Sequence, residues 1–164
     1  DQLHALNELA EHFRQDDLSN TIVVSPDLGN AKMATTFSRM LGTPVAAGAK
    51  QRFENDQVRI TSMIGDVKGK DVIVLDDEIA NGSTILEVLR LLADEGVGSV
   101  KVACTHGILS NGAVQRIAAI PAVTEIVCTN TVPIADEKRD PKLTVLTVAP
   151  AFAKAIRGDM PDHA

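Results

Sequence analysis

The feature that most constrains the fold is a series of short apolar blocks separated by stretches with a helical pattern. Each block is rich in β-branched residues and is bounded by Gly, Pro, Asp or Asn. Blocks of this length without polar alternation are typical of parallel strands buried on both faces. The six blocks are TIVVS (21–25), PVAAG (44–48), DVIVLD (71–76), SVKVACTH (99–106), TEIVCTN (124–130) and LTVLTV (143–148).

Between the blocks, apolar residues recur with the 3.6-residue spacing of a helix, as in ATTFSRML, ILEVLRLLADEG and AVQRIAAI. Alternating strands and helices predict an α/β fold with a mostly parallel sheet of about five strands, flanked by helices. The chain has 164 residues, of which 45% are hydrophobic, and this suits a single domain over residues 1–164. We expect the strand order to reverse beside the turn that follows the block at 71–76.

Composition excludes some classes of partner. The formal net charge of -6 argues against general binding to nucleic acids or anionic membranes, because both reward basic surfaces. The sequence has neither an apolar run of about 18 residues nor a signal-peptide pattern, so we expect a cytoplasmic protein. Cys104 and Cys128 lie inside apolar blocks, and we expect them to be buried free thiols.

Acidic and small residues follow two of the blocks, each time just before a helical stretch. PDLGN (26–30) follows the first block, and DDEIANGST (76–84) begins where the apolar part of the third block stops. Because ligands of open α/β sheets bind beyond the carboxyl ends of the strands, we expect these two turns to form one site. The polar and charged stretch GAKQRFENDQ (48–57) predicts a mobile surface loop.

The second turn combines donors for an anion with two acidic residues. Gly82 permits close approach of the backbone to a phosphate, and Asn81, Ser83 and Thr84 offer donors beside the free amides of a helix N-terminus. Asp76 and Asp77 repel phosphate, but they can accept hydrogen bonds from sugar hydroxyls or hold Mg²⁺ through water. The turn therefore favours a phosphorylated sugar, although helix capping explains Ser and Thr at such a position equally well.

These segments resemble a known family. DDEIANGST resembles the phosphoribosyl-binding loop of the type I phosphoribosyltransferase fold, and VVSPDLGNAK (23–32) resembles the pyrophosphate-binding turn of the ribose-phosphate pyrophosphokinases. Four further segments match the C-terminal half of that family in the same order: MIGDVKGKDVIVLDD (63–77), THGILS (105–110), TNTVPI (129–134) and VLTVAPAFAKAIR (145–157). The resemblance implies the C-terminal domain of a two-domain enzyme whose N-terminal half is absent from this chain.

The resemblance also implies an activity and its partners. Members of the family move the β,γ-diphosphoryl group of ATP onto the anomeric hydroxyl of ribose 5-phosphate, require Mg²⁺, and form homo-oligomers. The implied ribose-phosphate site comprises Asp76, Asp77, Asn81, Gly82, Ser83 and Thr84, and the implied pyrophosphate site comprises Asp27 and Gly29. Lys50 and Arg52 fall on the family's flexible catalytic loop. Asp27, Asp76 and Asp77 are the implied metal-binding residues, directly or through water.

Three positions depart from the family pattern. Ala80 stands where a carboxylate is expected, Asn81 replaces Thr, and Asn30 replaces the second Gly of the pyrophosphate turn. Two alternatives therefore stay open beside the catalytic interpretation. One is a non-catalytic relative that regulates an active enzyme, and the other is a phosphoribosyltransferase that acts on a base.

Overall fold

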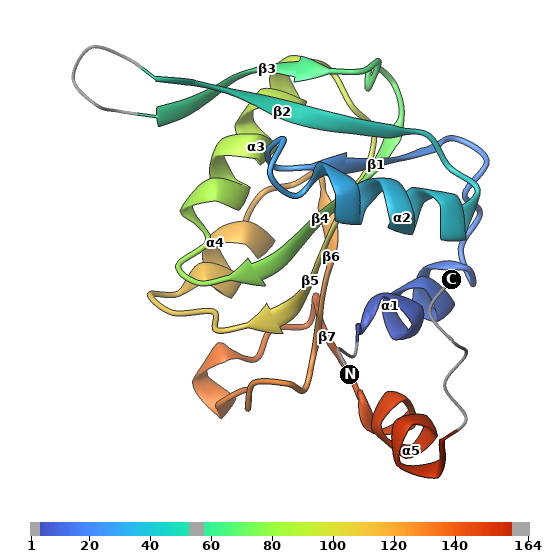
Figure 1. Ribbon diagram of the computed structural model, residues 1–164. Coiled ribbons are helices and arrows are strands. Elements are labelled where there is room, and N and C mark those ends of the chain that lie inside the picture. Colours follow the sequence, from blue (N-terminus) through green and yellow to red (C-terminus); the bar gives the residue numbers. More distant parts are fainter. Residues whose placement is uncertain (1–3, 53–57, 159–164) are drawn as a thin grey trace.

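A single sheet runs through the computed structural model, which describes residues 4–52 and 58–158 (Figure 1). Within these ranges the strand order is β3-β2-β1-β4-β5-β6-β7. The strands are β1 (Thr21–Ser25), β2 (Val45–Arg52), β3 (Val58–Ile64), β4 (Asp71–Ile79), β5 (Val100–Gly107), β6 (Val123–Thr129) and β7 (Leu143–Leu146). The helices are α1 (Leu6–Phe13), α2 (Ala31–Leu41), α3 (Ser83–Asp94), α4 (Ala113–Ala118), the short 3₁₀ helix η1 (Asp136–Lys138) and α5 (Ala149–Arg157).

The two faces of the sheet bury separate cores because successive side chains of a strand point to opposite faces. Val23 of β1 and Ile73 of β4 pack on one face with Phe13 of α1 and Phe37 of α2. The neighbouring residues of the same strands pack on the other face with α3 and α4. Figure 1 shows α2 on one side of the sheet and α3 with α4 on the other. The predicted α/β fold with helices on both faces is confirmed.

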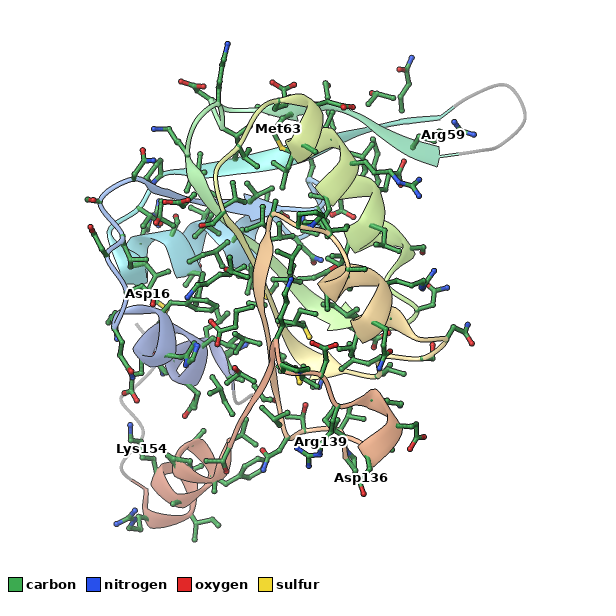
Figure 2. The ribbon with its side chains drawn as sticks, turned by 180° about the vertical axis from the view of Figure 1, so that it is seen from behind. Asp16, Arg59, Met63, Asp136, Arg139 and Lys154 are labelled. Carbon is green, nitrogen blue, oxygen red and sulfur yellow. The ribbon has the colours of Figure 1, made fainter. Side chains whose placement is uncertain are left out.

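The predicted count of five strands is wrong, since the described residues contain seven. The stretch interpreted as a loop from residue 48 onward begins inside β2, which pairs antiparallel with β3; residues 53–57 lie outside the described part. β3 was missed because it is a half-exposed edge strand, with Ile60 buried and Arg59 and Thr61 exposed. A register shift between Ala49 and Lys50 also disturbs the two-residue alternation. Figure 2 shows Met63 of β3, which packs against the core beside α3.

The strand order reverses between β1 and β4, as expected from the sequence. From β1 the chain moves outward through β2 and β3, and it then returns to β4 on the other side of β1. β1, β2 and β4 are parallel, so the turns that follow β1 and β4 meet at one edge of the sheet. This is the place where open α/β sheets hold their ligands.

The cysteines and the helix lengths also bear on the predictions made from the sequence. Cys104 and Cys128 are both free and buried, as predicted, and burial raises the pKa of the Cys128 thiol to about 11. Among residues 4–52 and 58–158, every helix is too short or too polar to cross a bilayer.

Candidate phosphate and sugar site

The turn after β1 is tight and is held by its own hydrogen bonds. The Ser25 hydroxyl donates to the carbonyl oxygen of Asp27 at 2.6 Å, and the backbone N–H of Asn30 donates to Asp27 Oδ1 at 3.1 Å. Strand β2 passes so close that a Cβ on Gly48 would lie 2.4 Å from the carbonyl oxygen of Pro26. Glycine at position 48 therefore allows β2 to pack directly against this turn.

Lys50 of β2 reaches the same turn. Its Nζ forms an ion pair with Asp27 Oδ2, while the other carboxylate oxygen accepts the backbone bond from Asn30. Burial alone would raise the pKa of Asp27, but the hydrogen bond from Lys50 and the backbone donors of the turn outweigh it and lower that pKa. Asp27 is therefore held as an anion, and its charge keeps the Lys50 ammonium at the sheet edge.

Asp76 and Asp77 lie within β4 and not after its end. The strand continues to Ile79, and Asp76 pairs with Cys104 in the ladder between β4 and β5. Asp76 is only 7% exposed, whereas Asp77 is exposed. Burial raises the pKa of Asp76 to about 7, and the neighbouring Asp77 carboxylate adds to this rise. Near neutral pH the charge of Asp76 is therefore sensitive to whatever binds beside it.

Asn30 joins the turn after β1 to strand β4. Its side-chain nitrogen donates to Asp76 Oδ1 at 2.7 Å and reaches Asp77 Oδ1 at 3.4 Å. From the sequence, Asn30 was noted only because it replaces the second Gly of the pyrophosphate turn, and no role was predicted for it. A bond between residues 46 positions apart depends on the tertiary fold, so the turn sequence alone does not reveal it.

The expected cradle follows β4 directly. A cavity of about 210 Å³ is lined by Asp76, Glu78, Ile79 and residues 80–84. Gly82 has the left-handed φ of 76° before the first residue of α3. The Ser83 N–H donates to Asn81 Oδ1 at 3.0 Å, which orients the Asn81 side chain, and the side-chain nitrogen of Asn81 carries donors suited to a phosphate.

Arg116 of α4 supports the cradle and was missed by the sequence analysis. Its guanidinium donates to the carbonyl oxygen of Asn81. The carbonyl oxygen of Ala80 is held as well, by the N–H of Ser110 at 2.8 Å. These contacts fix the backbone of the turn although Ala80 itself supplies no carboxylate.

A second cavity, of about 460 Å³, borders the site on the side of β5. Its lining includes Asp77, His106, Thr131, Met33 and Phe152. A hydrogen bond of 2.9 Å joins His106 Nδ1 to the Thr131 hydroxyl, which fixes the orientation of the imidazole. Asp76 thus borders the cradle and Asp77 borders the larger cavity, so the acidic pair lies at the boundary between the two.

Most of the predicted site residues come together. Direct contacts connect Lys50 to Asp27, Asp27 to Asn30, and Asn30 to both Asp76 and Asp77. Gly29 belongs to the same turn as Asp27, where an added Cβ would lie 3.0 Å from Asp27 Oδ1. Arg52 is the last residue of β2, and its side chain lies outside the described part of the structure.

The acidic pair fits one style of Mg²⁺ binding. Within the described residues, no group of three His, Cys, Asp or Glu side chains is arranged to hold a metal ion. Mg²⁺ commonly binds through one or two carboxylates and completes its shell with water and substrate phosphates. Asp76 and Asp77 supply two adjacent carboxylates of this kind. Asp27 is engaged by Lys50, so a metal role for it through water stays a prediction.

Comparison with known proteins decides the family. The family described as "Phosphoribosyl synthetase-associated domain" matches residues 57–161. The chain belongs to this phosphoribosyl synthetase family. A Streptomyces coelicolor protein provisionally named ribose-phosphate pyrophosphokinase is 60% identical over 157 residues, which cover 96% of this chain and 50% of that protein. The ribose-phosphate pyrophosphokinase of Clostridium acetobutylicum is 40% identical over 98% of this chain and 52% of its own length.

Solved structures of related proteins also match the fold of this chain. The phosphoribosylpyrophosphate synthetase of Mycobacterium smegmatis matches with a TM-score of 0.78 and 39% identity, over 94% of this chain and 48% of that one. An APRTase from Giardia lamblia shares the fold with a TM-score of 0.60 at 16% identity, over 87% of this chain and 76% of that one. The chain thus spans about half the length of the curated relatives it matches.

Proposed function

We propose that this chain is the part of a ribose-phosphate pyrophosphokinase that binds ribose 5-phosphate and the diphosphoryl group of ATP. The observation that carries the proposal is the pair of turns at the reversal of strand order. The cradle of residues 80–84 and the acidic pair Asp76 and Asp77 adjoin the turn that holds Asp27 and Lys50. Two relatives named ribose-phosphate pyrophosphokinase match almost the whole length of this chain.

The charges suggest which part of the site receives the phosphate and which receives the sugar. The amides and hydroxyls at the start of α3 attract the 5-phosphate, since a helix N-terminus carries positive partial charge. Asp76 and Asp77 repel that phosphate and accept hydrogen bonds from the ribose hydroxyls. The anomeric hydroxyl then points toward Asp27 and Lys50, where the diphosphoryl group of ATP arrives.

Lys50 is the proposed catalytic cation. Negative charge on the diphosphoryl oxygens shifts during transfer, and a nearby ammonium stabilises it most in the transition state. The ion pair with Asp27 keeps Lys50 at the sheet edge before ATP binds. Arg52, two residues farther along β2, is proposed to act on the same oxygens. Bound Mg²⁺, held by Asp76 and Asp77, would neutralise phosphate charge.

The remaining half of the protein completes the proposed enzyme. The chain corresponds to about half of each relative, so we propose that a second domain supplies the rest of the ATP site. A homo-oligomeric state and a cytoplasmic location are predictions of the same proposal. The whole of residues 1–164 is taken as one domain of that enzyme.

The test is AMP formation from ATP and ribose 5-phosphate by the full-length protein, with phosphoribosyl pyrophosphate measured in the same reaction. The proposal expects both products in equal amounts. Binding of ribose 5-phosphate without either product would favour the regulatory relative, which Ala80 in place of a carboxylate keeps open. Consumption of phosphoribosyl pyrophosphate with a base as acceptor would favour a phosphoribosyltransferase.

A further inference from the structure

Asn30 contacts three carboxylates from one position. Its side-chain nitrogen donates to Asp76 Oδ1 and reaches Asp77 Oδ1, and its backbone N–H donates to Asp27 Oδ1. The residue belongs to the turn after β1, whereas Asp76 and Asp77 belong to β4. It is therefore the physical link between the proposed sugar-binding pair and the turn proposed to receive the diphosphoryl group.

The side chain of Asn30 does not perform the ordinary role of its position. Asn30 is the N-cap of α2, where asparagine usually accepts a hydrogen bond from the helix amides. Here its side chain makes no cap hydrogen bond and instead donates to the carboxylates. Helix capping thus does not account for its orientation.

The bond to Asp76 restricts a buried group. Asp76 is almost completely buried, and its Oδ1 accepts both the Asn30 side chain at 2.7 Å and the backbone N–H of Asp77 at 2.9 Å. A buried carboxylate oxygen is costly to leave without donors, so these two bonds favour one rotamer of Asp76 over others. The backbone of residues 80–84 has supports of its own, because Arg116 donates to the carbonyl oxygen of Asn81 and the Ser83 N–H donates to the Asn81 side-chain oxygen.

We propose that Asn30 is a positioning residue that holds Asp76 and Asp77 in the orientation in which they accept the hydroxyls of a phosphorylated sugar. The inference rests on the proposed function, because it takes ribose 5-phosphate as the ligand. Glycine, which the family resemblance leads one to expect at this position, has no side chain that could make these contacts. The orientation of the acidic pair is thus set here by a residue that departs from the family pattern.

The proposal separates two ligands. Removing the Asn30 amide disturbs the carboxylates that receive the sugar but leaves the cradle that receives the phosphate. Asn30→Ala in the full-length protein should therefore weaken ribose 5-phosphate binding about tenfold and leave inorganic phosphate binding within about twofold of wild type. Asn30→Asp, which adds a fourth carboxylate to Asp27, Asp76 and Asp77, should weaken ribose 5-phosphate binding further.

Asn20→Ala is the matched control. Asn20 also donates its side-chain amide to one acceptor, the carbonyl oxygen of Gly69 at 3.0 Å. It lies just before β1, however, at the opposite end of that strand from the site. Calorimetry with ribose 5-phosphate and with inorganic phosphate is run on all variants, and melting temperatures verify that each is folded. The control should bind both ligands as wild type does.

The outcomes separate this proposal from the proposed function. Selective loss of ribose 5-phosphate affinity in Asn30→Ala supports the positioning role. Unchanged affinity in that variant, with normal binding by wild type, overturns the role of Asn30 and leaves the proposed function intact. Equal losses for both ligands also overturn it, because they indicate a general disturbance of the site. A wild-type protein that binds inorganic phosphate but not ribose 5-phosphate overturns both proposals.

Discussion

Lys50 of β2 and Asp27 of the turn after β1 form an ion pair across the edge of the sheet where the strand order reverses. The Lys50 side chain is 40% exposed and that of Asp27 is 23% exposed, so solvent screens much of the attraction. The pair therefore contributes little to folding stability. In the proposed function, the ion pair keeps a cation within reach of the incoming diphosphoryl group.

Substitution of Lys50 should separate turnover from sugar binding. In Lys50→Ala, the rate of AMP formation should fall by about a hundredfold or more, because the lost charge stabilises mainly the transition state. Affinity for ribose 5-phosphate should change by less than about threefold. Steady-state kinetics and calorimetry provide the two values.

Lys68→Ala is the control for charge removal, since Lys68 is exposed in the turn before β4. It should retain wild-type turnover. Losses of similar size in turnover and in ribose 5-phosphate affinity for Lys50→Ala would assign Lys50 to ground-state binding instead.

The close packing of α4 against the cradle predicts a specific effect at Gly82. A Cβ there would lie 3.2 Å from the Ala113 Cβ and 3.3 Å from the Ile117 Cδ1, and φ is +76°. Gly82→Ala should therefore lower the stability by about 1–2 kcal/mol and weaken phosphate binding as the turn shifts away from α4. Denaturant titration and calorimetry with inorganic phosphate measure both effects.

Gly42→Ala is the control that separates the effect of backbone strain from the effect of contact with α4. Gly42 also has a positive φ, of +68°, but a Cβ there meets nothing within 4 Å. This variant should lose some stability and no phosphate affinity. If Gly82→Ala bound phosphate as tightly as wild type, the cradle would not be the phosphate site.

The raised pKa of Asp76 predicts a pH dependence of stability. Burial first, and then the neighbouring Asp77, raise this pKa from 3.8 to about 7. The folded state therefore holds the proton more tightly than the unfolded chain, and this group makes the protein less stable as pH rises from about 4 to about 7. Asp76→Asn, which stays neutral and keeps an acceptor for Asn30, should become more stable than wild type by on the order of 1 kcal/mol at pH 8.

Melting temperatures in metal-free buffer at pH 4, 6 and 8 test this. The advantage of Asp76→Asn should be smallest at pH 4 and should grow toward pH 8. Glu11→Gln, a change at an exposed carboxylate of α1, should follow wild type at every pH. An advantage that is constant from pH 4 to pH 8 would show that the pKa of Asp76 is not raised in the folded protein.

The sequence predicts those parts of the molecule whose pattern is local. Buried parallel strands such as β4 and β5 appear as continuous apolar runs, and the start of α3 appears as a turn rich in small polar residues. β3 has no such pattern, because only some of its residues are buried and a register shift interrupts its pairing with β2. Its partner β2 was predicted only as far as residue 48 for the same reason.

Side chains that support the site from distant elements were not predictable. Arg116 reaches Asn81 over 35 positions, and Asn30 reaches Asp76 over 46. Neither contact leaves a periodic or spacing signal, since each depends on how α4 and α2 pack on opposite faces of the sheet.

The central claim is that Asp76 and Asp77 receive the sugar while the cradle of residues 80–84 receives the phosphate. The most direct measurement is calorimetry of the full-length protein and of the double variant Asp76→Asn with Asp77→Asn, each titrated with ribose 5-phosphate with and without Mg²⁺. The account predicts that ribose 5-phosphate affinity falls at least about tenfold in the variant, while inorganic phosphate still binds. Unchanged ribose 5-phosphate affinity under both conditions would contradict it.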